Sequence, residues 1–117
     1  MLSFTGNLKV WVALEPTDMR KSYEGLAALV AHSFKLDVKS GALFVFTNRK
    51  RNRLKILYWD GSGLWVLSKR LEQGCFSWPQ PSEANQLTLA LRPEAFAMLT
   101  DGVDLRGAKL RPWYERQ

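Results

Sequence analysis

The sequence predicts an α+β fold in which an antiparallel β-sheet is packed on one face by one longer and one short α-helix. Three observations support this fold class. Several short segments alternate apolar and polar residues, as half-buried strands do. One stretch carries apolar residues every three to four positions, as an amphipathic helix does. Turn-forming residues separate these segments, and a length of 117 residues suits one domain.

The chain begins with a predicted strand followed by the longer helix. The strand is predicted at residues 8–14, where leucine and valine occupy every second position and form one apolar face. Pro16 ends it, because proline has no N–H to donate, and Thr17 or Asp18 is suited to cap the helix that follows. The helix is predicted at residues 19–34.

The middle of the chain predicts a four-stranded antiparallel meander. Its clearest turn is the sequence DGSG at residues 60–63, because glycine supplies the positive φ of tight hairpins. The strands are predicted at residues 42–47, 53–59, 64–71 and 75–78. A proline-containing break at residues 79–82 then precedes a last strand at residues 87–91. Pro93 opens a short helix that Gly102 closes.

The domain organisation predicted from these elements is one compact domain over residues 1–105 and a basic C-terminal tail over residues 106–117. The tail contains Trp113 and Tyr114, and it is interpreted either as an arm that orders on a partner or as a frayed end. No apolar run approaches the ~20 residues of a membrane span, and no signal peptide is predicted. Cys75 is the single cysteine, which favours a cytoplasmic location.

Positive charge is concentrated in one part of the chain. The net charge is +6, and residues 49–72 hold seven bases against two acids. Such a concentration attracts polyanions, nucleic acid first. The candidate nucleic-acid-binding residues are Arg20, Lys21, Arg49, Lys50, Arg51, Arg53, Lys55, Lys69 and Arg70. The alternative is a solvated hairpin that protects a sheet edge, with Arg20 and Lys21 neutralised by Asp18 and Glu24.

Four tryptophans fall on predicted strands: Trp11, Trp59, Trp65 and Trp78. Aromatic side chains interleaved with cations can stack nucleobases. Most tryptophans of a small sheet protein belong to its core, so we expect one of the four to be exposed.

The search for an active site returns little. His32 and Cys75 are each the single residue of their type, which excludes a tetrahedral site built from histidine and cysteine and favours neither a catalytic triad nor a metal cofactor. His32 is expected to face solvent. A magnesium-dependent nuclease is a weaker alternative that requires convergence of several carboxylates, drawn from Asp18, Asp60, Asp101 and Asp104. We predict no enzyme activity, no cofactor and no small-molecule substrate.

Several blocks of the sequence carry a family resemblance. They are EPTDMRKSYEGLAALV at residues 15–30, SGALFVF at residues 40–46 and RLKILYWDGSGL at residues 53–64, followed by KRLE at residues 69–72, GCFSWP at residues 74–79 and LTDGVD at residues 99–104. In this order and spacing they resemble the TnpB-type accessory proteins, encoded by the second open reading frame, of a bacterial insertion-sequence family, number sixty-six in the usual naming.

The resemblance implies a protein that assists DNA transposition beside a separate transposase, to which the metal-dependent chemistry belongs. Its matched cations are Arg20, Lys21, Arg53, Lys55, Lys69 and Arg70, whereas the role of residues 49–52 is not carried over. We therefore expect a non-catalytic accessory protein that binds DNA at transposon ends through the basic hairpin and associates with the nucleoid when bound. The alternative is an adaptor that contacts the transposase or other element-encoded proteins without touching DNA.

Overall fold

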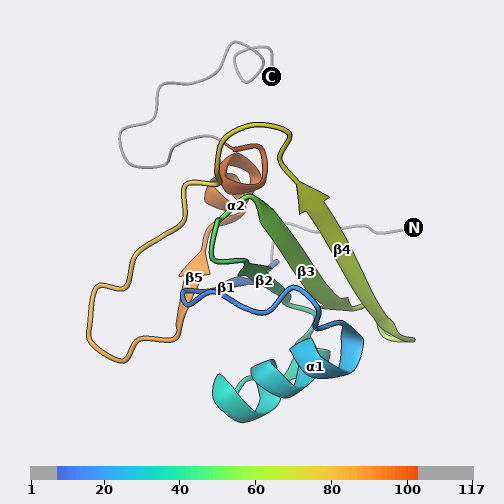
Figure 1. The fold of residues 1–117 in the computed structure, drawn as a ribbon. Coiled ribbons are helices and arrows are strands. Elements are labelled where there is room, and N and C mark those ends of the chain that lie inside the picture. Colours follow the sequence, from blue (N-terminus) through green and yellow to red (C-terminus); the bar gives the residue numbers. More distant parts are fainter. Residues whose placement is uncertain (1–7, 103–117) are drawn as a thin grey trace.

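A five-stranded sheet with a helix on each face forms the structure (Figure 1). The computed structural model describes residues 8–102, so the predicted tail lies outside the described residues. The strands are β1 (Val10–Ala13), β2 (Leu43–Thr47), β3 (Arg53–Trp59), β4 (Leu64–Arg70) and β5 (Thr88–Leu91). The helices are α1 (Tyr23–Ala28), continued by the π-helical turn η1 (Leu29–Ser33), the short 3-10 helix η2 (Val38–Ser40), and α2 (Pro93–Thr100). The α+β class, with one longer and one short helix, is confirmed.

The strand order is β4-β3-β2-β1-β5, and one of its pairings is parallel. β1 and β2 run parallel, with Val10 beside Leu43, whereas the other three pairings are antiparallel. A parallel pair needs a crossover connection of a dozen or more residues. Residues 14–42, which contain α1, provide that crossover. The expectation of a wholly antiparallel sheet is therefore corrected at this one pairing.

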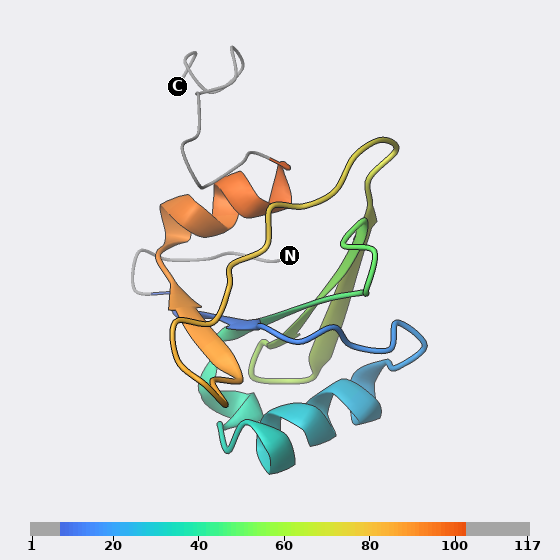
Figure 2. The same cartoon turned by 60° about the vertical axis from the view of Figure 1, so that its left-hand side comes forward.

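The two helices lie on opposite faces of the sheet, not together on one face as the sequence predicted (Figures 1 and 2). The cause is visible in β2, where all five residues are buried. Leu43 and Val45 point to the face that α2 covers, and Phe44 and Phe46 point to the face that α1 covers. Because successive side chains of a strand alternate between faces, a strand that is apolar throughout needs cover on both.

The predicted strand at residues 75–78 is absent, so the meander has three strands instead of four. Its alternating apolar residues are buried nonetheless, because Phe76 and Trp78 pack into the core on the α2 face. The segment is held by isolated hydrogen bonds. The Phe76 N–H donates to the Arg51 carbonyl at 2.7 Å, and Trp78 Nε1 donates to the Ala13 carbonyl at 2.8 Å. Alternation here reflects side-chain burial without strand pairing.

The first helix begins at Tyr23, four residues later than predicted. Asp18 does not cap it and instead organises a turn. Its side chain accepts a hydrogen bond from the Arg20 N–H at 2.9 Å, and its carbonyl accepts one from the Lys21 N–H at 3.1 Å. Ser22 is the N-cap residue, without a side-chain capping bond. Arg20 and Lys21 therefore lie in a turn before the helix.

Candidate nucleic-acid interface

The connection between β2 and β3 is a hydrogen-bonded loop that carries Arg49, Lys50 and Arg51. Asn48 closes it: its side-chain oxygen accepts from the N–H groups of Asn52 at 3.1 Å and Arg53 at 3.2 Å. Arg51 has a φ of 58°, and the Phe76 N–H binds its carbonyl. The loop backbone is thus held from both sides. Arg49 and Lys50 are exposed, whereas Arg51 is half-buried.

The pairing of β3 with β4 places two arginines directly opposite each other. Arg53 pairs with Arg70, and two positions along Lys55 pairs with Ser68. Cross-strand partners share a face of the sheet, so all four side chains lie on the face that α1 covers. Both arginines are exposed. Within the described residues, neither of them has an acidic partner. In the part of the chain that the structure describes, no ion pair therefore compensates the charge of these two arginines.

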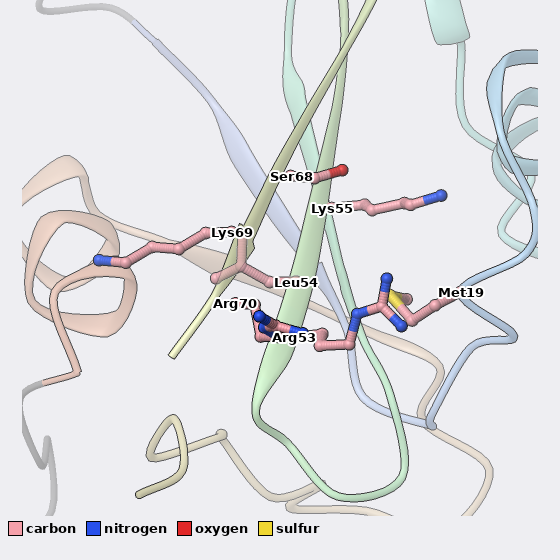
Figure 3. A pocket seen from close by; sticks show the side chains of 7 residues that line it. All are labelled: Met19, Arg53, Leu54, Lys55, Ser68, Lys69 and Arg70. Atoms are coloured by element: carbon pink, nitrogen blue, oxygen red, sulfur yellow. The ribbon is translucent and has the colours of Figure 1, made fainter. Parts of the chain in front are cut away.

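These side chains line a groove between the sheet and the turn that precedes α1. The groove has a volume of about 260 Å³, and Met19 forms its far wall (Figure 3). A second hollow of about 340 Å³ continues from it along the β2–β3 loop and shares Met19 and Arg53. We call the two together the basic groove. The residues that line it are Pro16, Thr17, Asp18, Met19, Asn48, Arg49, Arg53, Leu54, Lys55, Ser68, Lys69 and Arg70.

Two lysines beside the groove donate hydrogen bonds to main-chain carbonyls on opposite faces of the sheet. Lys55 Nζ donates to the Lys21 carbonyl at 2.7 Å and so fastens the turn before α1 to β3. Lys69 Nζ donates to the Thr100 carbonyl at 2.7 Å, at the end of α2. Figure 3 shows the Lys69 side chain pointing away from Met19. Lys69 therefore directs its charge to the other side of the sheet, although part of the residue lines the groove.

Arg20 is paired with the acid of its own turn. Its guanidinium binds both carboxylate oxygens of Asp18, with an Nη2–Oδ2 distance of 2.7 Å. These hydrogen bonds lower the pKa of Asp18 to about 2, and the carboxylate raises the pKa of Arg20. A carboxyl whose pKa is lowered by folding stabilises the fold above its ordinary pKa of 3.8, and that contribution is lost as the pH falls towards 2. At neutral pH the pair is fully charged, and the Arg20 side chain is 91% exposed.

The structure thus brings most of the predicted cations to one side of the molecule. Arg49, Arg53, Lys55 and Arg70 line the basic groove, and Arg20 and Lys21 lie on the turn beside it. The sequence reasoning missed Met19, Asn48 and Ser68. Ser68 could have been found from the DGSG turn, since a tight turn joining residues 60 and 63 places residue 68 opposite residue 55.

The tryptophans do not contribute a stacking platform to the groove. Trp65 is 40% exposed, as expected for one of the four. Its cross-strand partner Tyr58 packs on the α2 face, so Trp65 lies on that face and not on the face of the groove. Its indole Nε1 donates to Asp60 Oδ2 at 2.8 Å, which lowers the pKa of Asp60 together with hydrogen bonds from the turn. Trp11 and Trp59 are half-buried and Trp78 is buried.

The carboxylates do not converge in the described part of the chain. Asp18 and Asp60 are engaged in separate turns, and no group of three potential metal-ligating residues occurs among residues 8–102. Asp104 lies outside the described residues. His32 is exposed, as expected. None of the helices within residues 8–102 is both long enough and apolar enough to cross a membrane.

The fold and the groove define a small α+β protein with a cationic surface formed by the β2–β3–β4 meander and the turn before α1. The chain belongs to the family of IS66 Orf2 like proteins, whose family model matches residues 8–110. It is thus an accessory protein of an insertion sequence, from a family that is not a known catalytic one. This confirms the resemblance found in the sequence.

Two relatives from Sinorhizobium fredii (strain NBRC 101917 / NGR234) are similar over nearly their whole length. The uncharacterized protein y4jC is 36% identical over 112 residues, which cover 96% of this chain and 93% of the relative. The uncharacterized protein y4hO is 38% identical over 106 residues, which cover 91% of this chain and 90% of the relative. No solved structure matches the chain.

Proposed function

We propose that this chain is a non-catalytic accessory protein that assists transposition by binding the DNA of transposon ends through the basic groove. The observation that carries the proposal is the pairing of two exposed arginines, Arg53 and Arg70, without an acidic partner in the described residues. Like charges placed directly opposite each other destabilise a sheet. A bound polyanion removes that repulsion, so the arrangement suits a phosphate-binding surface better than a purely structural one.

The chemistry of the groove fits a phosphate backbone. Guanidinium groups form paired hydrogen bonds with phosphate oxygens, and side chains on one face of a strand recur about every 7 Å. The Ser68 hydroxyl, opposite Lys55, adds a neutral hydrogen-bond donor of the kind that also contacts phosphates. Contacts of this type position a protein on DNA without reading its sequence. We therefore propose a backbone-binding role for the groove.

The hydrogen bonds that hold the walls of the basic groove in place support the same proposal. Lys55 joins β3 to the turn at residues 18–21, and Asn48 closes the loop that carries Arg49. Phosphate-binding groups on a preorganised frame lose less conformational freedom on binding than groups on a free loop. Both walls of the groove are therefore suited to a ligand that runs along the end of β3.

The test is a salt titration of the full chain with fluorescently labelled duplex DNA from a transposon end, followed by fluorescence anisotropy. We expect binding at low salt and a linear fall of log affinity with log salt concentration, with a slope of about −0.9 for each phosphate contact. A scrambled duplex of equal length is the control for sequence preference. Undetectable binding at low salt, or an affinity independent of salt, would contradict the proposal.

A second candidate function is that of a protein-interaction adaptor for the transposase. It is favoured by a largely apolar hollow of about 420 Å³ between the first helix and the β3–β4 turn, lined by alanines of the helix, Val38, Leu64 and Trp59. Apolar hollows with an aromatic wall suit protein partners. Co-purification with the transposase that survives nuclease treatment and high salt would support this function, whereas loss of the complex under those conditions would support contact through DNA.

A further inference from the structure

Among the described residues, β4 forms one edge of the sheet and is paired with a strand on one side only. It pairs with β3 over all seven of its residues, from Leu64 opposite Trp59 to Arg70 opposite Arg53. No strand within residues 8–102 pairs with its other side. The pairing is one-to-one, without a bulge, and the strand contains no proline. Natural sheets protect an edge of this length with such features or with charged side chains, and the two charges of β4, Lys69 and Arg70, are confined to one end of the strand.

The ladder shows which main-chain groups of β4 point outwards. The Leu71 N–H donates to the Asn52 carbonyl, and the Asp60 N–H donates to the Gly63 carbonyl. Because bonded and non-bonded pairs alternate in an antiparallel ladder, the odd-numbered residues of β4 bond to β3. The outward N–H and C=O groups therefore belong to Leu64, Val66, Ser68 and Arg70.

We propose that two copies of this chain pair antiparallel along their β4 edges to form one continuous ten-stranded sheet. With Leu67 at the two-fold axis, Leu64 of one copy meets Arg70 of the other, and Val66 meets Ser68. Outward-pointing groups then face outward-pointing groups, which provides about eight main-chain hydrogen bonds. This register uses the whole of β4.

The side chains of β4 are complementary to themselves in this register. Trp65, which is 40% exposed, stands opposite Lys69 of the second copy, so its ring can pack on the aliphatic part of that lysine while the ammonium stays on the Thr100 carbonyl. The two positive charges of the strand, Lys69 and Arg70, come to opposite ends of the junction. A parallel pairing in register would bring them directly together, which is unfavourable. Charge therefore favours the antiparallel arrangement of identical strands over the parallel one.

The pairing has a geometric consequence for DNA contact. A two-fold axis that relates antiparallel strands of one sheet is perpendicular to it, so α1 of both copies lies on the same face. The Arg70 residues are then six strand positions apart, about 20 Å. On the proposed function, the dimer would present two basic grooves to one duplex. The pairing itself does not depend on that function, so it is tested without DNA.

The first experiment measures the mass of the nuclease-treated full chain by light scattering over a range of concentrations. We expect twice the chain mass for the unchanged protein and for Ser68→Ala, and the single chain mass for Ser68→Pro. Proline at this position removes an outward N–H and leaves the ladder with β3 intact. Circular dichroism checks that each variant is folded. A single chain mass for the unchanged protein, or a folded Ser68→Pro dimer, would overturn the proposal.

The second experiment tests the register of the two β4 strands. It also tests whether the two copies pair along β4 if the Ser68→Pro variant does not fold. Cys75, which is exposed, is first replaced by serine. Chains carrying Trp65→Cys and chains carrying Lys69→Cys are then oxidised separately and as a mixture. Residues 65 and 69 of opposite copies form a non-hydrogen-bonded pair with Cα atoms about 4.5 Å apart, within disulfide reach.

Identical positions lie about 13 Å apart across the axis, beyond disulfide reach. We therefore expect a disulfide-linked dimer from the mixture and at least a tenfold slower reaction from either chain alone. Equal rates in all three samples, or no linked dimer in the mixture, would overturn the proposed register. If the mixture forms no disulfide-linked dimer but the DNA titration shows salt-dependent binding, the proposed pairing is wrong and the proposed function stands.

Discussion

Replacing Arg53 and Arg70 together by glutamine should have opposite effects on folding and on DNA binding. The two side chains are direct cross-strand neighbours and both are exposed, and neither meets an acid among the described residues. Removing their repulsion should raise the free energy of unfolding by about 0.2–0.5 kcal/mol, a small effect because both groups are in solvent. Glutamine keeps most of the side-chain length, so the packing of the groove is little changed.

The effect on binding follows from counterion release. Each lost phosphate contact reduces the slope of log affinity against log salt by about 0.9, so the double variant should lose about 1.8. Relative to a 1 M reference, this corresponds to a loss of about 60-fold in affinity at 0.1 M salt. Fluorescence anisotropy with a transposon-end duplex measures the slope, and urea denaturation followed by tryptophan fluorescence measures stability.

Two controls separate the position of the charges from their number. Lys35→Gln with Arg92→Gln removes the same net charge from exposed residues outside the groove, and it should change the slope by clearly less. Lys69→Gln is matched to Arg70→Gln, because the two are neighbours in β4 but point to opposite faces. An equal loss of slope in the groove variants and in the controls would refute the reasoning, as would an unchanged slope in the groove variant.

Three further predictions follow from single contacts. Asp18→Asn should release Arg20 for a phosphate contact, which increases the slope of log affinity against log salt by about 0.9 and the affinity for DNA by about 8-fold at 0.1 M salt. Glu83→Gln is the charge-matched control, and equal effects of the two substitutions would show that only net charge matters. Leu99→Ala should lower the free energy of unfolding by about 2–5 kcal/mol in urea denaturation, because this side chain of α2 is fully buried; a loss below about 1 kcal/mol would contradict that packing. Trp78→Phe should cost about 1–3 kcal/mol in the same measurement, because it removes the indole donor from a buried carbonyl.

Local patterns of the sequence were enough to predict most elements of the fold. The strand predicted at residues 53–59 is β3, and Pro93 and Gly102 bound α2 as expected. These elements depend on alternation, on turn glycines and on the fixed φ of proline, all of which act within a few residues. The segment at residues 75–78 shows the limit of that reasoning. Its alternation is real, but its main chain joins no strand, and two buried side chains with isolated hydrogen bonds hold it in the core.

The candidate site was predicted in composition more than in geometry. Seven bases within residues 49–72 indicated where positive charge is concentrated, but not which side chains share a face. The register of β3 against β4 places Arg70 beside Arg53, and the same register sends the neighbouring Lys69 to α2. A shift of one residue would exchange their places, since side chains alternate between faces.

The sequence by itself determined the fold class, the family and the concentration of positive charge, because each depends on residue type and near spacing. Only the tertiary structure decided that the helices cover opposite faces, that β1 and β2 run parallel, and that Arg20 is held by Asp18 whereas Arg53 meets no acid in the described chain. The physical reason is that burial and pairing between distant segments decide which side of a sheet each residue faces.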